Sequence, residues 1–84
     1  MSKLTETPRA KARAKFEGLL KEGMELKRLT YEELAHRIGV SRPTLNRMRN
    51  DPTGLTFAQV GLISDITGIP ESAFHEVLRN VPRR

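Results

Sequence analysis

Two short amphipathic patterns follow one another between residues 31 and 50, with almost no chain between them. Apolar residues recur at helical spacing on both sides of Gly39, which is typical of two helices that each bury one face. Thr30 and Glu33 form a capping-box pattern for the first helix, and Ser41 is a good N-cap for the second. Because only about three residues join them, the helices must cross at a steep angle over a shared core.

This crossing divides the side chains between residues 31 and 50 into an inner and an outer set. Gly39 permits a sharp exit from the first helix, and the small Ala35 keeps that helix thin at the crossing. The residues predicted to pack are Leu34, Ala35, Ile38, Gly39, Val40, Leu45 and Met48. The outer set is polar and basic, and it comprises Arg42, Pro43, Thr44, Asn46 and Arg47.

Helix start and stop signals along the rest of the chain predict an all-α fold, a compact bundle of about five short helices. The expected helices cover residues 8 to about 27, 31–38, 42–50, 57–67 and 70 to about 81. Gly18 and Gly23 weaken the first helix by about 1 kcal/mol each, so it is expected either to kink or to begin after Pro8. The predicted core residues of the fourth helix are Phe57, Val60, Ile63 and Ile66. We expect a flexible tail at 1–7, a single domain at 8–81 and a basic tail at 82–84.

Composition narrows the possible functions. The 84 residues include no cysteine, and His36 and His75 lack a ligand pattern, so we expect no metal, no other cofactor and no small-molecule ligand. No catalytic constellation is evident, which predicts that the protein is not an enzyme. There is no apolar run of membrane-spanning length and no signal-peptide pattern, so a cytoplasmic location is expected. A net charge of +5 favours a polyanionic partner, nucleic acid before a membrane surface.

The chain resembles the Cro/repressor helix-turn-helix family, also called the XRE family, which is typified by phage repressors and bacterial relatives. The resemblance covers about residues 19–78. It rests on Leu34-Ala35, Ile38-Gly39-Val40-Ser41, Leu45 and Met48, followed by Phe57, Val60, Ile63, Ile66, Gly68 and Ile69. It implies a lambda repressor-like domain with its helix-turn-helix at 31–50, whose second helix enters the major groove of double-stranded DNA.

The resemblance also implies roles for individual residues. Arg42, Pro43, Thr44, Asn46 and Arg47 occupy base-reading positions. Phosphate contacts are expected from Tyr31, Ser41, Arg49 and His36. Two of these have a plainer alternative, Tyr31 as a packing residue and His36 as an exposed one. Lys11, Arg13 and Lys15 form either a solvated face or a basic arm onto DNA.

Three departures from the family pattern bear on these roles. Pro43 can offer a base only apolar contact, such as contact with a thymine methyl group. Arg28 stands where a glycine often ends the first helix. Many members pair an arginine of the first helix with a glutamate late in the recognition helix, and those places hold Met24 and Arg49. We therefore expect no such ion pair here, and an Arg49 that is free to bind phosphate.

Two functions of different classes follow. The first is a sequence-specific regulator of transcription, a repressor that acts by promoter occlusion in a bacterial or phage-infected cell. The second is a protein-interaction module, such as an antitoxin-like partner, that retains the fold. The arginine-rich outer face favours the first. The last expected helix carries four apolar residues at helical spacing. They either cover the core or form the interface of a homodimer that assembles on DNA: Phe74, Val77, Leu78 and Val81.

Overall fold

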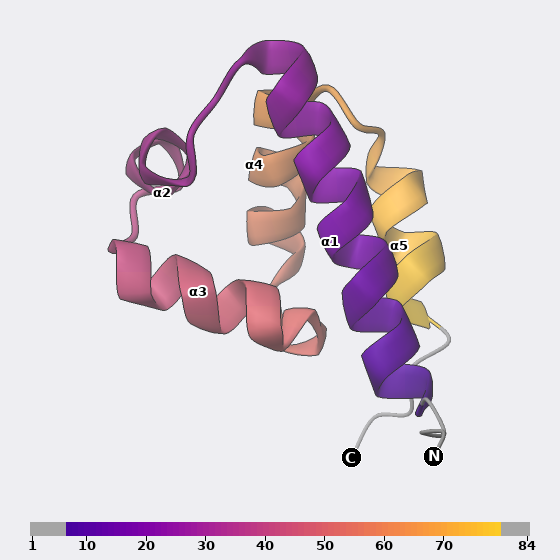
Figure 1. Ribbon diagram of the computed structural model, residues 1–84. Coiled ribbons are helices and arrows are strands. Elements are labelled where there is room, and N and C mark those ends of the chain that lie inside the picture. The colour runs from indigo at the N-terminus through magenta and orange to yellow at the C-terminus, as the bar shows by residue number, and fades with distance from the viewer. Residues whose placement is uncertain (1–6, 80–84) are drawn as a thin grey trace, which may run out of the picture.

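The computed structural model describes residues 7–79, and within them it contains five α-helices, one 3-10 turn and no strand (Figure 1). The elements are α1 (Pro8–Lys27), α2 (Tyr31–Ile38), α3 (Arg42–Asn50), η1 (Pro52–Gly54), α4 (Phe57–Thr67) and α5 (Glu71–Arg79). The all-α prediction is confirmed. Val81 and the tails predicted at both ends lie outside the described residues, apart from Thr7, which caps α1. No described helix has the length and apolar character needed to cross a membrane.

Side-chain caps start the helices where the sequence predicts. Thr30 accepts a hydrogen bond from the backbone N–H of Glu33, whose carboxylate accepts one from the N–H of Thr30 in return. Thr7 and Ser41 also cap their helices, so α1 begins at Pro8 and not later. The pair of Thr56 and Gln59 caps α4 in the same reciprocal way.

Left-handed backbone ends three of the helices. Gly39 and Gly68 adopt φ values of 88° and 81° after α2 and α4. Arg28 does the same after α1 with φ 56°, and it is the one non-glycine residue among 7–79 with a positive φ. This conformation is costly for a residue with a side chain, so Arg28 carries strain where a glycine would carry none.

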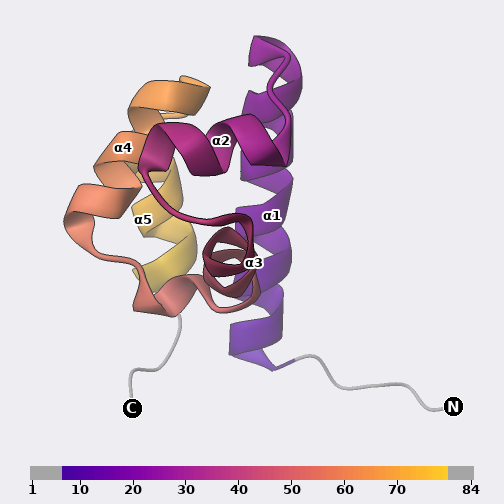
Figure 2. The ribbon, with the colours of Figure 1, turned by 90° about the vertical axis from the view of Figure 1, so that its left-hand side faces the viewer.

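The long helix α1 runs through the structure, with α4 and α5 packed on one side and α3 on another, while α2 packs against α3 and α4 (Figures 1 and 2). Its residues Phe16 and Leu20 are buried, and the ring of Phe16 meets that of Phe74 from α5 with centroids 5.5 Å apart. The core also takes one or more residues from every other α-helix: Leu34, Ala35, Leu45, Val60, Ile63 and Phe74.

Gly23 allows α1 to approach the end of α4 closely. A Cβ atom at this position would lie 2.6 Å from the Cβ atom of Thr67, a distance that real contacts essentially never show. Thr67 is itself buried, and its hydroxyl donates to the carbonyl of Ile63. Gly18, by contrast, faces open space. Gly23 therefore serves helix packing, a role that its weakening of the helix does not reveal.

Two aromatic residues lie where the sequence analysis did not place them. Phe57 was expected in the core, but it is 82% exposed, because it is the first residue of α4 and extends beyond the elements that cover Val60 and Ile63. Phe74 was a candidate for the dimer seam, but it is fully buried against Phe16. The core alternative for Phe74 is thus confirmed, and the prediction for Phe57 is wrong.

Candidate nucleic-acid interface

Helices α2 and α3 lie on the side of the molecule away from α5, where they cross through the turn at Gly39 (Figures 1 and 2). The backbone N–H groups of Gly39 and Val40 both donate to the carbonyl of Ala35, which closes the end of α2. Leu34, Ala35 and Leu45 are buried, while Ile38, Val40 and Met48 are partly buried against the core. Six of the seven residues predicted to pack are therefore buried or partly buried, whereas Gly39 is exposed and serves the turn through its positive φ.

The outer surface of α3 carries the predicted base-reading residues. Arg42, Pro43, Asn46 and Arg47 are exposed, and Thr44 is partly buried. Ser41 is exposed and caps the helix, since its hydroxyl accepts from the N–H of Thr44. No acidic residue occurs between Arg42 and Asn50. This part of the surface is thus positive and rich in hydrogen-bond donors.

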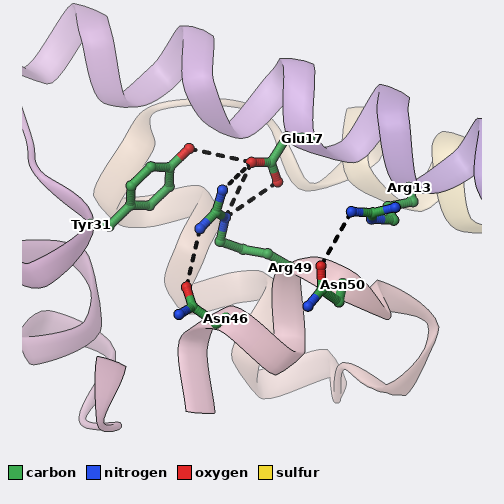
Figure 3. A network of polar contacts seen from close by, with 6 residues as sticks. All are labelled: Arg13, Glu17, Tyr31, Asn46, Arg49 and Asn50. Carbon is green, nitrogen blue, oxygen red and sulfur yellow. Dashed lines mark hydrogen bonds and ion pairs between the residues drawn. The ribbon is translucent and has the colours of Figure 1, made fainter. Parts of the chain in front are cut away.

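Arg49 points inward and is bound by α1 (Figure 3). Its Nε donates to a carboxylate oxygen of Glu17 at 3.1 Å, and its Nη2 forms an ion pair with the same carboxylate. The guanidinium also lies 3.9 Å from the ring centroid of Tyr31, a cation–π contact. Because these contacts occupy Arg49, our expectation that it is free to bind phosphate is wrong.

The ion pair between α1 and the end of α3 also exists, contrary to our expectation that it would be absent. Its charges are reversed relative to the family pattern, because the acid is on α1 and the base on α3. The family resemblance places the α1 partner at Met24, which is buried in the core. Glu17 stands two helical turns earlier on the same face, so the error is one of position along α1.

Tyr31 completes this cluster from α2. It is partly buried, its hydroxyl donates to Glu17 at 3.3 Å, and its ring also lies 5.7 Å from the guanidinium carbon of Arg42. The alternative role of Tyr31 as a packing residue accounts for where its side chain lies. A phosphate contact by Tyr31 stays a prediction, as does one by the exposed His36 on α2.

The cluster shifts the proton affinity of two of its members. Hydrogen bonding to Glu17 raises the pKa of the Arg49 guanidinium above its ordinary value. Burial, and then the negative charge of Glu17, raise the pKa of Tyr31 above 10.0. At neutral pH the cluster therefore holds a charged Arg49 and a neutral Tyr31 that donates its hydroxyl proton to the carboxylate.

A second contact joins α1 to the same end of α3. Arg13 donates to the side-chain oxygen of Asn50 at 3.2 Å (Figure 3). This places a basic residue from the first half of α1 beside the end of α3. Sequence reasoning missed Glu17 and Asn50, although Glu17 is the one acidic residue between residues 8 and 21. An isolated acid among basic residues, next to the core residue Phe16, was the available signal.

Two short helices that cross through a glycine turn, with a basic face on the second, define a helix-turn-helix domain of the DNA-binding class. A family model described as helix-turn-helix matches residues 20–74, which is more than half of the chain. The chain belongs to the Cro/repressor (XRE-type) helix-turn-helix family, a family of DNA-binding transcription regulators. Comparison with curated proteins and with solved structures gave no match.

Proposed function

We propose that this protein is a sequence-specific transcriptional repressor that places α3 in the major groove of double-stranded DNA and occludes a promoter. The observation that carries this proposal is that the three arginines of α3 are placed differently. Arg49 is held inside by Glu17, whereas Arg42 and Arg47 are exposed on the outer surface. Arginine is the side chain best suited to bind the N7 and O6 atoms of guanine with two hydrogen bonds.

The remaining outer residues fit the same use. Pro43 offers an apolar surface near the start of α3, suited to a thymine methyl group, while Thr44 and Asn46 offer polar atoms. Ser41, which caps α3, and the exposed His36 on α2 are proposed to contact phosphate. Promoter occlusion requires only that the protein stays bound to its DNA site.

Binding to duplex DNA should depend strongly on salt. If several phosphates are covered, log K falls against log salt with a slope of about −0.9 for each phosphate neutralised. Affinity should be measured for one duplex between low and physiological salt. A flat dependence would contradict DNA binding.

Arg42→Ala or Arg47→Ala should weaken binding to a selected site by roughly 1–3 kcal/mol, and much less on random DNA. Lys27→Ala is the control, because it removes one positive charge from the exposed end of α1, away from α3 and from the groove described below. Equal losses on the two DNAs would make Arg42 and Arg47 phosphate ligands and not readers of bases.

We also propose that two copies bind together on DNA. One recognition helix reads few base pairs, and relatives of this fold place two of them one turn of DNA apart on a pseudo-palindrome. Since Phe74 is in the core, we propose that the two copies meet at a groove lined by residues of η1, α4 and α5. Phe57, Leu55 and Leu78 line that groove, together with Val60 and His75. The 3-10 turn η1 joins α3 directly to this groove, so a seam there brings two copies of α3 close together.

The apolar surface at this seam consists of a few side chains, so we expect the free protein to be monomeric and the dimer to form on the operator. Phe57→Glu and Leu78→Glu should each abolish the complex of two proteins on one duplex and leave the melting temperature nearly unchanged. Leu26→Glu is the control, because Leu26 is 73% exposed on α1 and does not line the groove. A two-to-one complex that survives both changes would contradict this seam. Retention of a protein partner through Phe57 without DNA binding would instead favour the protein-interaction alternative.

A further inference from the structure

The oxygen atoms of the α3 side chains share one feature. Helix α3 has three such oxygens, in Thr44, Asn46 and Asn50, and each accepts a hydrogen bond from an arginine of this chain. Arg47 donates to Thr44 at 3.3 Å, Arg49 to Asn46 at 3.1 Å, and Arg13 to Asn50 at 3.2 Å. The acceptors of the recognition helix are thus directed at the protein's own cations.

Asn46 is the central case. A guanidinium group can only donate, so the Asn46 atom that faces Arg49 must be its oxygen. Arg49 is in turn held by the carboxylate of Glu17 and lies over the ring of Tyr31, which fixes the position of the cation. Figure 3 shows the Asn46 oxygen directed at Arg49, with the amide nitrogen on the other side of the group.

Thr44 loses its acceptor capacity in a different way. Its hydroxyl oxygen accepts from Arg47 and also from the hydroxyl of Ser41 at 3.0 Å. A hydroxyl oxygen has two lone pairs, so both are used. The hydroxyl hydrogen remains available to a ligand.

The outer side of α3 therefore offers donors alone. Its donors are the guanidinium groups of Arg42 and Arg47, the hydroxyl of Thr44 and the amide of Asn46. In the major groove, guanine presents two acceptors and thymine presents one. Adenine presents its N7 acceptor beside an amino group that donates, and cytosine presents an amino group alone. Donors placed opposite amino groups would leave both unsatisfied, which is costly in a dehydrated interface.

We propose that α3 selects the keto bases, guanine and thymine, on the DNA edge that it contacts, and that Asn46 donates to such a base. A free asparagine side chain commonly forms a two-bond pair with adenine, using its oxygen and its nitrogen together. Asn46 cannot present both atoms to one base while its oxygen faces Arg49. The Glu17–Arg49 pair thus acts on specificity through Asn46. This inference rests on the proposed DNA-binding function.

Selection of duplexes from a random pool by the full chain tests it. The position read by Asn46 is the one at which Asn46→Asp changes the enriched base. Every base pair contains one keto base, so the comparison follows one strand of the site. Where the natural protein enriches guanine or thymine on that strand, we expect Asn46→Asp, whose carboxylate accepts, to enrich cytosine or adenine on the same strand. Asn50→Asp is the matched control, since it makes the same charge change at the last residue of α3 beside another arginine. It should weaken binding to all duplexes without changing the preferred base.

Each outcome of the selection decides the matter. No enriched duplex at any salt concentration overturns the proposed function and this inference with it. An exchange of guanine for thymine, or of thymine for guanine, on the same strand in Asn46→Asp overturns this inference alone. So does an enriched site in which no position depends on Asn46.

Base analogues test the same point on the natural protein and need no variant to fold. At a contacted guanine, replacement by 7-deazaguanine removes the N7 acceptor and should weaken binding about tenfold. Removal of the amino group from the paired cytosine should leave affinity unchanged. The reverse result, a loss with the amino group and none with N7, overturns the inference.

Release of the Asn46 oxygen should restore adenine reading. The double variant Glu17→Gln, Arg49→Met removes both charges together, so neither is left without its partner. With Arg49 gone, we expect adenine to become acceptable at the Asn46-dependent position. An unchanged preference in the folded double variant would show that Arg49 does not direct Asn46.

Discussion

Helix α1 packs against α4 and α5 through apolar atoms, whereas charged and polar groups join it to α2 and α3 in addition to the shared apolar core. On the apolar side Phe16 packs against Phe74, and Gly23 lies against Thr67. On the polar side Glu17 binds Arg49 and accepts from Tyr31. The apolar seam depends on volume, because close-packed atoms cannot yield to an added carbon. The polar seam depends on the sign of charge, and here those signs are reversed relative to the family pattern.

This difference between the two seams shows how one helix can both hold the fold and position the DNA-reading helix. The apolar seam builds the body of the domain. The polar seam positions α3, the part that reads DNA, and it also decides which side chains of α3 remain outside. The following changes separate the two seams, beginning with the largest expected effect.

Phe74→Ala should cost about 3–5 kcal/mol of unfolding free energy, because it removes a fully buried ring and leaves a cavity against Phe16. Phe57→Ala, at an 82% exposed position, should change stability by less than about 0.5 kcal/mol. Urea unfolding followed by circular dichroism measures both. Equal losses would mean that the two aromatic residues are buried alike, contrary to the structure.

Gly23→Ala should destabilise the protein by about 1–3 kcal/mol, since the new methyl group would overlap Thr67 where two helix backbones meet. Gly18→Ala on the same helix should instead stabilise it by about 0.5–1 kcal/mol, because that position is open and alanine is the better helix former. Thermal melts of both variants give the comparison. If both variants were stabilised, α1 and α4 would not approach each other at Gly23.

Glu17→Arg should cost about 1–2 kcal/mol, between the values of exposed and buried ion pairs, because the two side chains are 31% and 24% exposed. Arg49→Glu should cost a similar amount. The double variant with both changes should recover at least half of the summed loss, since it restores an ion pair of opposite sense. Strictly additive losses in this cycle would show that the pair contributes no coupling energy.

Tyr31 offers the smallest effect and the most direct measurement. The chain has one tyrosine and no tryptophan, so absorbance of the tyrosinate reports Tyr31 alone. Its pKa should lie above 10.0, and Glu17→Gln should lower that pKa by removing the carboxylate. Because the folded-state pKa is raised, the stabilisation from this group is complete below about pH 10 and disappears as the pH rises through the higher value. An unshifted titration would place Tyr31 away from Glu17.

Helix boundaries and the basic character of α3 were readable from the residues alone. The caps at Thr7, Thr30, Ser41 and Thr56 lie within three residues of the N–H groups that they satisfy, so sequence contains the whole interaction. The turn at Gly39 is local in the same sense. Fold class and the composition of the outer surface followed from these short-range rules.

Contacts between side chains that are far apart in the sequence could not be predicted in this way. The Arg49 and Glu17 side chains are 32 residues apart in the chain, and no local pattern says which turn of α1 faces the end of α3. Phe57 and Phe74 both fit the apolar face of a helix. Phe57 is exposed because the neighbouring elements do not extend over the start of α4, whereas Phe74 lies under them and is buried.

Sequence thus determined where each helix begins and that the second helix of the motif is basic, because those features depend on contacts within about one helical turn. Tertiary structure decided which of the three α3 arginines turns inward and which oxygens of α3 are occupied, because those depend on how α1 crosses α3. The glycine at position 23 shows the same limit. Its cost to the helix is local, but its benefit exists only where Thr67 comes within contact distance.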